Sequence, residues 1–193
     1  MAAGRRMKIV AGLGNPGPAY DATRHNVGWW VLDRICHDWG FGGFRKDGAA
    51  MAAAGERGGA EVLLLKPLSY MNRSGPALGP FLGAEGFDPA ADLLVVVDDA
   101  ALDVGRVRFR PAGSDGGHNG LASVVATLGS EAFARLRVGV GRPPPEWDLV
   151  DWVLAPMDTE DEDRVIELLP SLAEGVELWI REGIEPVMNR FNR

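Results

Sequence analysis

The stretch that decides the fold is Leu93-Leu94-Val95-Val96-Val97, which runs directly into Asp98-Asp99. Five consecutive apolar residues, three of them valine, are typical of a strand that is buried on both faces, as in the parallel sheet of an α/β protein. Asp98 then places a carboxylate at the carboxyl end of this strand, and open α/β sheets bind their ligands at that edge. The stretch therefore predicts both a covered sheet and the place of a functional site.

Strands and helices alternate along the rest of the chain. Apolar and alternating patterns predict further strands over residues 7–13, 62–65, 106–110 and 136–140, with a candidate edge strand over residues 49–54. Helices are predicted over residues 26–40, 74–82 and 121–128, followed by a long final helix that begins at a capping box of Thr159 and Glu162. This alternation predicts a single α/β domain with a twisted mixed β-sheet and helices packed on both sides. We expect the domain to span residues 8–193, after a short N-terminal extension over residues 1–7.

The composition is that of a globular protein with one full core. The chain has 193 residues, of which 46% are hydrophobic, and no apolar run is long enough to cross a bilayer. The basic N-terminus is followed by an apolar stretch that is too short for a signal peptide. The single cysteine, Cys36, excludes an intrachain disulfide and is typical of a reducing compartment. We therefore expect a cytoplasmic protein with no membrane segment.

The overall charge does not favour a nucleic-acid ligand. The formal net charge is -7, whereas phosphate binding requires positive surface. The arginines are nevertheless clustered, in two groups made of Arg106, Arg108 and Arg110, and of Arg135, Arg137 and Arg142. Charge alone therefore weighs mildly against RNA and leaves room for a local basic patch.

Polar residues gather in four segments that adjoin the predicted strands and helices. Because the carboxyl ends of parallel strands share one edge of the sheet, we expect these segments to meet in one crevice. The candidate residues in them are Asn15, Tyr20 and His25 after the first strand, Tyr70, Met71 and Asn72 after the second, then Asp98 and Asp99, and finally His118 and Asn119.

A dinucleotide-binding pattern is also present after the first strand. Gly12, Gly14 and Gly17 spell G-x-G-x-x-G, and Asp33 follows at a plausible distance. That motif requires a helix to begin at its third glycine, so that the helix N-terminus faces the pyrophosphate. Prolines flank Gly17, and the predicted helix begins only near residue 26. A nicotinamide-dependent enzyme is therefore an alternative that the local sequence disfavours.

Asp98 and a histidine form the candidate catalytic pair. A carboxylate at the end of a buried strand is costly unless it is paired, and a histidine facing it would keep one ring nitrogen protonated and the other free as a base. His25 and His118 lie in the candidate loops, whereas His37 lies late in the first helix and is expected to face solvent. No metal-ligand spacing joins the three histidines, so we expect no metal.

Amide side chains complete the predicted crevice. Asn15, Asn26, Asn72 and Asn119 offer both donors and acceptors, which suits recognition of peptide groups. The sequence has no G-x-S-x-G nucleophile motif, and Cys36 is expected to be buried. Amides, one His–Asp pair and aromatic side chains together predict acyl transfer or ester hydrolysis, in which the histidine activates water.

The ordered motifs resemble one family along nearly the whole chain. GLGNPG, Tyr20, T-R-H-N, K-P-L-S-Y-M-N-R-S-G, Asp98-Asp99, GGHNG and R-L-R-V-G-V-G occur in the order found in the bacterial-type peptidyl-tRNA hydrolases. The resemblance implies a single α/β domain, usually monomeric and without cofactors, that cuts the peptide from tRNA. The partner would be peptidyl-tRNA, contacted at its 3′ end and acceptor stem.

The resemblance also implies a role for each matching residue. His25 would be the catalytic base, Asp98 would hold it in its basic form, and Asn15 would discriminate peptidyl-tRNA from free aminoacyl-tRNA. Binding of the peptide end and orientation of the water fall to Asn72 and Asn119. The other matching substrate or tRNA contacts are Tyr20, Tyr70, Met71, His118, Arg110 and Arg137, the two arginines forming a clamp near the acceptor stem.

Two positions depart from the family pattern. Ala101 stands where members usually carry a second acid, and Glu146-Trp147 stand where many carry a lysine that contacts RNA; Arg142 is the candidate substitute. A second alternative is a non-catalytic RNA-binding relative, as occurs among some organellar proteins that resemble this family. Retention of His25, Asp98 and the pocket asparagines favours the hydrolase.

Overall fold

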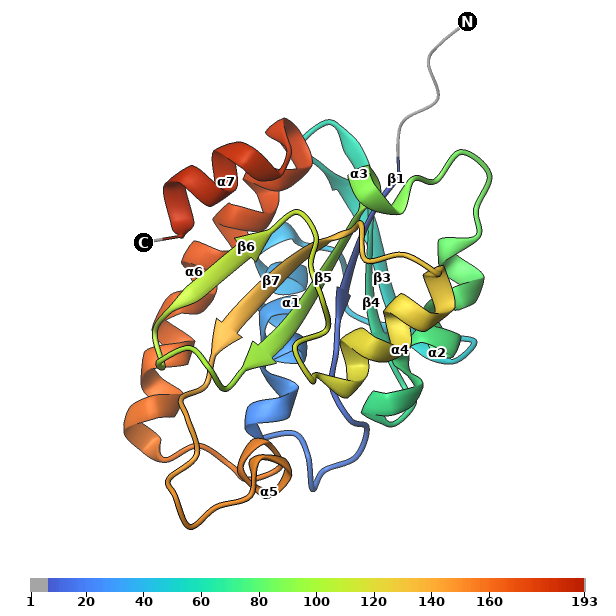
Figure 1. The fold of residues 1–193 in the computed structure, drawn as a ribbon. Helices are drawn as coiled ribbons and strands as arrows, with labels where there is room; N and C mark the ends of the chain where they lie inside the picture. The colour runs from blue at the N-terminus through green and yellow to red at the C-terminus, as the bar shows by residue number, and fades with distance from the viewer. Residues whose placement is uncertain (1–6, 193) are drawn as a thin grey trace, which may run out of the picture.

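The computed structural model describes residues 7–192 and shows a single α/β domain (Figure 1). Its core is a seven-stranded mixed sheet with the order β2-β3-β4-β1-β5-β7-β6. Strands β4, β1, β5 and β7 run parallel, and the strands outside them pair antiparallel. The strands are β1 (Met7–Gly12), β2 (Arg45–Asp47), β3 (Ala50–Arg57), β4 (Ala60–Pro67), β5 (Leu93–Asp99), β6 (Val107–Arg110) and β7 (Ala134–Gly139).

Helices cover both faces of the sheet, as the sequence predicted. One hydrophobic core lies between the sheet and α1, α6 and α7, and a second lies between the sheet and α2 and α4 (Figure 1). The helices are α1 (Val27–Trp39), α2 (Ser74–Leu82), α3 (Pro89–Asp92), α4 (Asn119–Leu128), α5 (Leu149–Val153), α6 (Thr159–Glu182) and α7 (Ile184–Phe191). Two short 3₁₀ turns, η1 (Arg24–Asn26) and η2 (Met71–Arg73), precede α1 and α2.

Strand β5 occupies the centre of the sheet. All seven of its residues are buried, which confirms the prediction from the apolar run Leu93–Val97. The strand lies between β1 and β7, so its two faces contact both hydrophobic cores. Asp98 and Asp99 consequently end the most enclosed strand of the domain, and their charges require partners.

Helix α1 packs unusually close to the ends of β1 and β5. A Cβ atom at Gly28 would lie 2.6 Å from the carbonyl oxygen of Val96, so only glycine fits there. The helix ends at Gly40, whose left-handed backbone (φ 69°) caps it as the sequence predicted. This close packing places η1, which carries His25, directly beside the carboxyl end of β5.

Two local predictions were wrong. The strand predicted over residues 49–54 is present as β3, but it is not the edge strand of the sheet, because β2, a short strand of exposed charged residues, pairs with residues 50–52 on its outer side. The final helix does not begin at a capping box of Thr159 and Glu162. Its N-cap is Asp158, whose carboxylate accepts from the backbone N–H of Asp161, and Thr159 is already helical. Met7 begins β1, in agreement with the strand predicted over residues 7–13, and the rest of the N-terminal extension lies outside the described residues.

Among residues 7–192, no helix has both the length and the apolar character needed to cross a membrane.

Candidate active site

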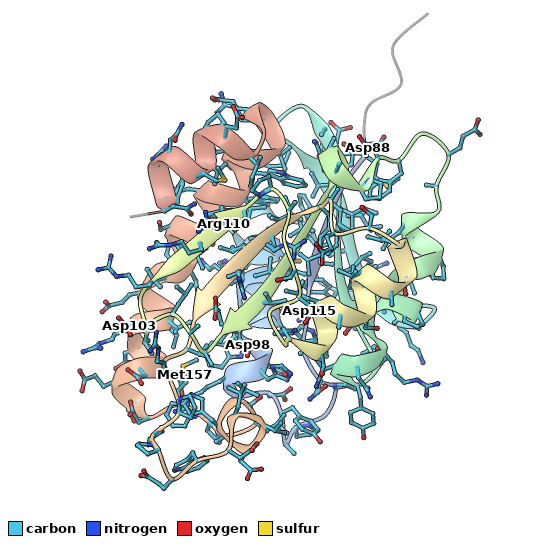
Figure 2. All side chains as sticks on the ribbon, viewed as in Figure 1. Asp88, Asp98, Asp103, Arg110, Asp115 and Met157 are labelled. Atoms are coloured by element: carbon cyan, nitrogen blue, oxygen red, sulfur yellow. The ribbon has the colours of Figure 1, made fainter. Side chains whose placement is uncertain are left out.

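The predicted polar segments meet in one cleft at the carboxyl ends of the parallel strands. In Figure 2, Asp98 lies at the lower end of β5, above η1 and α5. The cleft has a volume of about 740 Å³. Ten of the predicted site residues line it: Asn15, Tyr20, His25, Tyr70, Met71, Asn72, Asp98, His118, Asn119 and Arg137.

Arg110 is the predicted site residue that does not line the cleft. It pairs in register with Arg135, which lies opposite Val95, three residues before Asp98 on β5. Figure 2 accordingly shows Arg110 higher on the sheet than Asp98. Any contact of Arg110 with a ligand must therefore be made with a part that extends beyond the cleft.

His25 and His118 share one oxygen of Asp98. The Oδ1 atom of Asp98 lies 2.8 Å from Nδ1 of His25 and 2.9 Å from Nε2 of His118. The two imidazole rings are 5.0 Å apart between centroids. All three side chains are nearly buried, so this network is sheltered from bulk water on every side except the cleft.

Backbone hydrogen bonds determine which nitrogen of His118 carries its proton. Nδ1 of His118 accepts from the backbone N–H groups of Gly120 and Leu121 at the start of α4. Because this nitrogen is an acceptor, the proton resides on Nε2 and is donated to Asp98. His118 therefore caps α4 and cannot serve as a base without losing those bonds.

The same reasoning identifies the free nitrogen of His25. Its Nδ1 donates to the Asp98 carboxylate, so Nε2 keeps its lone pair and His25 lines the cleft. Burial by itself raises the pKa of Asp98, but attraction to His118 and His25 and the hydrogen bonds from both outweigh burial. The pKa of Asp98 is consequently held well below its usual range, and the carboxylate stays charged.

Asn15 is fixed in one orientation by three hydrogen bonds. Its Oδ1 accepts from the backbone N–H of Met71 at 2.7 Å. The side chain of Asn26 bonds both backbone polar groups of Asn15, at 2.9 Å each. The bond from Met71 fixes the orientation of the amide and leaves its NH₂ group without a hydrogen bond to any of residues 7–192, so this group is the one that Asn15 presents to a ligand in the cleft.

Aromatic and aliphatic side chains line the remainder of the cleft. Tyr20 and Tyr70 contact each other edge to face, with centroids 6.3 Å apart. On the α5 side, the cleft is lined by Leu149, Val150, Val153 and Leu154. These α5 residues were not predicted from the sequence, because the helix is only five residues long and too short for a periodic pattern.

Arg137 lies beside Asp99 at the edge of the cleft. Nε of Arg137 is 3.1 Å from Oδ2 of Asp99, and the arginine side chain is 28% exposed. Arg142, the proposed substitute for a lysine, is exposed and also lines the cleft. These two arginines supply positive charge locally in a chain of net charge -7.

Residues without metal-ligand spacing in the sequence nevertheless form a cluster of potential ligands in the fold. His25, Asp98 and His118 are far apart in sequence, yet the fold brings one potential ligand atom of each within 4.8 Å of the others. However, Nδ1 of His25 and Nε2 of His118 already lie at hydrogen-bond distance from the same carboxylate oxygen of Asp98. Nδ1 of His118 also has a partner, because it accepts from a backbone N–H of α4. The three side chains thus form a hydrogen-bonded triad. A zinc site would instead hold its nitrogen and oxygen ligand atoms around a central ion, each about 2.0–2.2 Å from it.

We therefore expect activity to survive exhaustive treatment with a metal chelator. The measurement is hydrolysis of N-acetylated aminoacyl-tRNA before and after chelation and dialysis, with a zinc-dependent hydrolase treated in parallel as the control. Loss of activity that added zinc restores would contradict this prediction.

The dinucleotide-binding alternative lacks the helix that it requires. Gly17 is followed by a turn, η1 and only then α1, which begins at Val27. No helix N-terminus is therefore present at the third glycine to bind a pyrophosphate. Gly12 on β1 and Gly28 on α1 together allow the close approach of helix and sheet, because a Cβ at Gly12 would lie 2.4 Å from the carbonyl oxygen of Gly28.

Comparisons with known proteins identify the family of this chain. A family model described as "Peptidyl-tRNA hydrolase" matches residues 9–193. The peptidyl-tRNA hydrolase of Gemmatimonas aurantiaca is 46% identical over 191 residues, covering 97% of this chain and 100% of the relative. The Symbiobacterium thermophilum protein of the same name is 47% identical over 195 residues, covering 96% and 98%. The crystal structure of peptidyl-tRNA hydrolase from Acinetobacter baumannii is similar, with a TM-score of 0.89, 30% identity and coverage of 96% and 94%. This chain belongs to the bacterial-type peptidyl-tRNA hydrolase family, as its motifs predicted.

Proposed function

We infer that this protein hydrolyses the ester bond that joins a peptide, or an N-blocked amino acid, to tRNA. The observation that carries this inference is the hydrogen bond from Nδ1 of His25 to the buried Asp98 carboxylate, which leaves Nε2 as a base in a cleft lined by amides. Release of N-acetylated amino acid from tRNA by the purified protein is the direct test. Absence of release would favour the alternative of a non-catalytic RNA-binding relative.

The geometry supports a direct attack by water. Nε2 of His25 takes a proton from water while the water oxygen forms a bond with the ester carbonyl carbon. The tetrahedral intermediate then collapses, the carbon–oxygen bond to the ribose breaks, and the imidazolium returns its proton to the leaving ribose oxygen. The charge of Asp98 stabilises the imidazolium between these two steps.

Binding is divided between the two parts of the substrate. Asn15, Asn72 and Asn119 are proposed to bind the peptide end, because amides pair with peptide groups without a charge. Arg137 is proposed to contact the acceptor stem from the edge of the cleft, and Arg110 to contact it farther along the sheet. The 3′ end of the tRNA would then enter the cleft while the duplex stays outside.

Asn15 provides a physical basis for sparing ordinary aminoacyl-tRNA. Its NH₂ group is presented to the substrate because Oδ1 accepts from Met71, so an incoming ammonium meets a neutral amide at Asn15 rather than a carboxylate. Burying an unpaired ammonium is costly, whereas a peptide carbonyl accepts the same hydrogen bond. Asn15→Asp should therefore raise hydrolysis of free aminoacyl-tRNA relative to the N-acetylated form.

The measurement is the ratio of kcat/KM for N-acetylated and free aminoacyl-tRNA. Asn15→Ala is the matched control, because it removes the donor without adding a negative charge. An unchanged ratio in Asn15→Asp would show that Asn15 only shapes the loop.

We also propose that the protein acts as a monomer in the cytoplasm. The monomer follows from the family resemblance, and the compartment is supported by Cys36, which is free and buried. Sedimentation of the purified protein tests the monomer, and fractionation of cells that express it tests the compartment.

A further inference from the structure

Arg24 is a buried charged residue that the mechanism above does not use. It precedes His25 in η1, and only 4% of its surface is exposed. Burial lowers the pKa of Arg24, and the nearby carboxylates of Asp161 and Asp158 oppose that effect. An arginine stays protonated in proteins, so this side chain is a buried cation whose position requires an explanation.

The guanidinium of Arg24 binds the end of α5. Its Nη1 atom donates to the carbonyl oxygens of Pro156 at 2.8 Å, Ala155 at 3.2 Å and Trp152 at 3.3 Å. Carbonyl groups at the end of a helix have no partners within the helix, and a cation there also matches the helix dipole. One side chain therefore satisfies the end of α5 and the segment that follows it.

Backbone and stacking contacts strengthen the same connection. The backbone N–H of Arg24 donates to the carbonyl of Ala155, and Thr23 forms an antiparallel bridge with Pro156. The guanidinium also lies over the ring of Trp152, with its central carbon 3.5 Å from the ring centroid. Trp152 is held from its other side by a bond from its Nε1 to the carbonyl of Gly141.

Helix α5 has apolar side chains that are exposed to solvent in the cleft. Leu149 and Val150 are 51% and 55% exposed, and both line the cleft with Val153 and Leu154. Of the six large apolar side chains that are strongly exposed in residues 7–192, three line this cleft, Tyr70 being the third. Exposed apolar groups concentrated at one cleft indicate a binding surface for an apolar group.

We propose that Arg24 is a positioning residue that holds α5 against the turn carrying His25, so that α5 forms a subsite for an apolar side chain of the residue esterified to tRNA. This proposal rests on the proposed function and adds a preference among its substrates. The asparagine amides bind peptide groups, which all amino acids share. The apolar side chains of α5 would contact the side chain of the esterified residue, which differs from one amino acid to another. An apolar side chain gains contact with these α5 side chains, and glycine, which has no side chain, gains none.

The test compares N-acetyl-phenylalanyl and N-acetyl-glycyl esters of the same tRNA, with kcat and KM measured separately. Wild-type protein should have the lower KM for the phenylalanyl ester. Arg24→Met should raise that KM by about tenfold, the lower end of what an apolar pocket contributes to discrimination, and should change the glycyl KM little. Arg24→Lys should restore part of the preference, because it keeps the charge and can donate to one of the carbonyls. Arg164→Met, on the exposed face of α6, is the matched control.

Two further measurements apply if Arg24→Met does not fold. Val150→Ser changes an exposed position and should reduce the same preference. Hydrogen exchange of the backbone amides in residues 149–155 should be faster in Arg24→Lys than in wild type.

The possible outcomes are distinct. The proposal would be overturned if Arg24→Met raised the KM of both esters equally. It would also be overturned if Val150→Ser left the preference for the phenylalanyl ester unchanged. A shifted pH profile for the glycyl ester would overturn it too, since Arg24 would then act on His25. If wild-type protein hydrolyses neither ester, the proposed function itself fails.

Discussion

Replacing His25 by alanine is expected to lower kcat on N-acetylated aminoacyl-tRNA by about two to four orders of magnitude, the usual share of a general base. The physical reason is that Nε2 of His25 is the free nitrogen of the triad, whereas both nitrogens of His118 are occupied. His118 therefore cannot take over as the base. The KM should change much less than kcat, because the amides that bind the peptide stay in place.

The matched control is His37→Ala. His37 lies in α1 with its side chain 86% exposed, far from the cleft, and should leave both constants unchanged. Single-turnover measurements with each variant separate the chemical step from product release. Normal turnover by His25→Ala would exclude the water-activation mechanism.

Replacing Asp98 by asparagine is expected to lower kcat by about ten- to a thousand-fold, less than the loss of the base itself. An amide oxygen can still accept from His25, but it carries no charge to stabilise the imidazolium. The amide NH₂ group also competes for the lone pairs of the two histidines and can select the wrong tautomer of either ring. The loss should therefore appear in kcat.

The pH dependence of Asp98→Asn gives a second test of the same contact. A carboxylate stabilises the protonated imidazolium and a neutral amide does not. Without it, the free base form persists to lower pH, so the acidic limb of the kcat/KM profile should move to lower pH. A limb that stays in place would mean that Asp98 orients His25 without affecting its charge.

Asp99→Asn is the natural comparison, because it makes the same chemical change one residue away. Asp99 has different partners: it lies 3.1 Å from Nε of Arg137 and accepts from the backbone N–H of Ala101. We expect its replacement to affect tRNA affinity through Arg137 and to reduce kcat less than Asp98→Asn. A larger loss of kcat in Asp99→Asn would identify Asp99 as the acid that assists catalysis.

Local sequence identified most of the elements that form the site. The apolar run before Asp98 predicted the central buried strand, and Gly40 predicted the end of α1, because both signals depend on neighbouring residues alone. Ten of the eleven residues that the motifs assigned to the site line the cleft, and Arg110 is the exception. Arg110 belongs to the short strand β6, and its height on the sheet depends on the register with β7, which periodicity does not specify.

Other features had no local signal. Helix α5 is too short for a pattern, and the N-cap of α6 was misplaced by one residue, because Asp158 and Thr159 are both good capping residues. The edge of the sheet was also assigned to the wrong strand. The true edge strand, β2, has only three residues, which is too short for a pattern in the sequence.

The sequence by itself determined an α/β domain, its family, and a carboxylate at the end of its central strand. Only the tertiary structure decided that His25 and His118, 73 and 20 residues from Asp98 along the chain, bind the same oxygen atom. It likewise decided that Arg24 reaches α5, more than a hundred residues away. Contacts of this kind depend on strand order, on register and on the close packing that Gly28 allows, and these are properties of the assembled sheet rather than of any local run of residues.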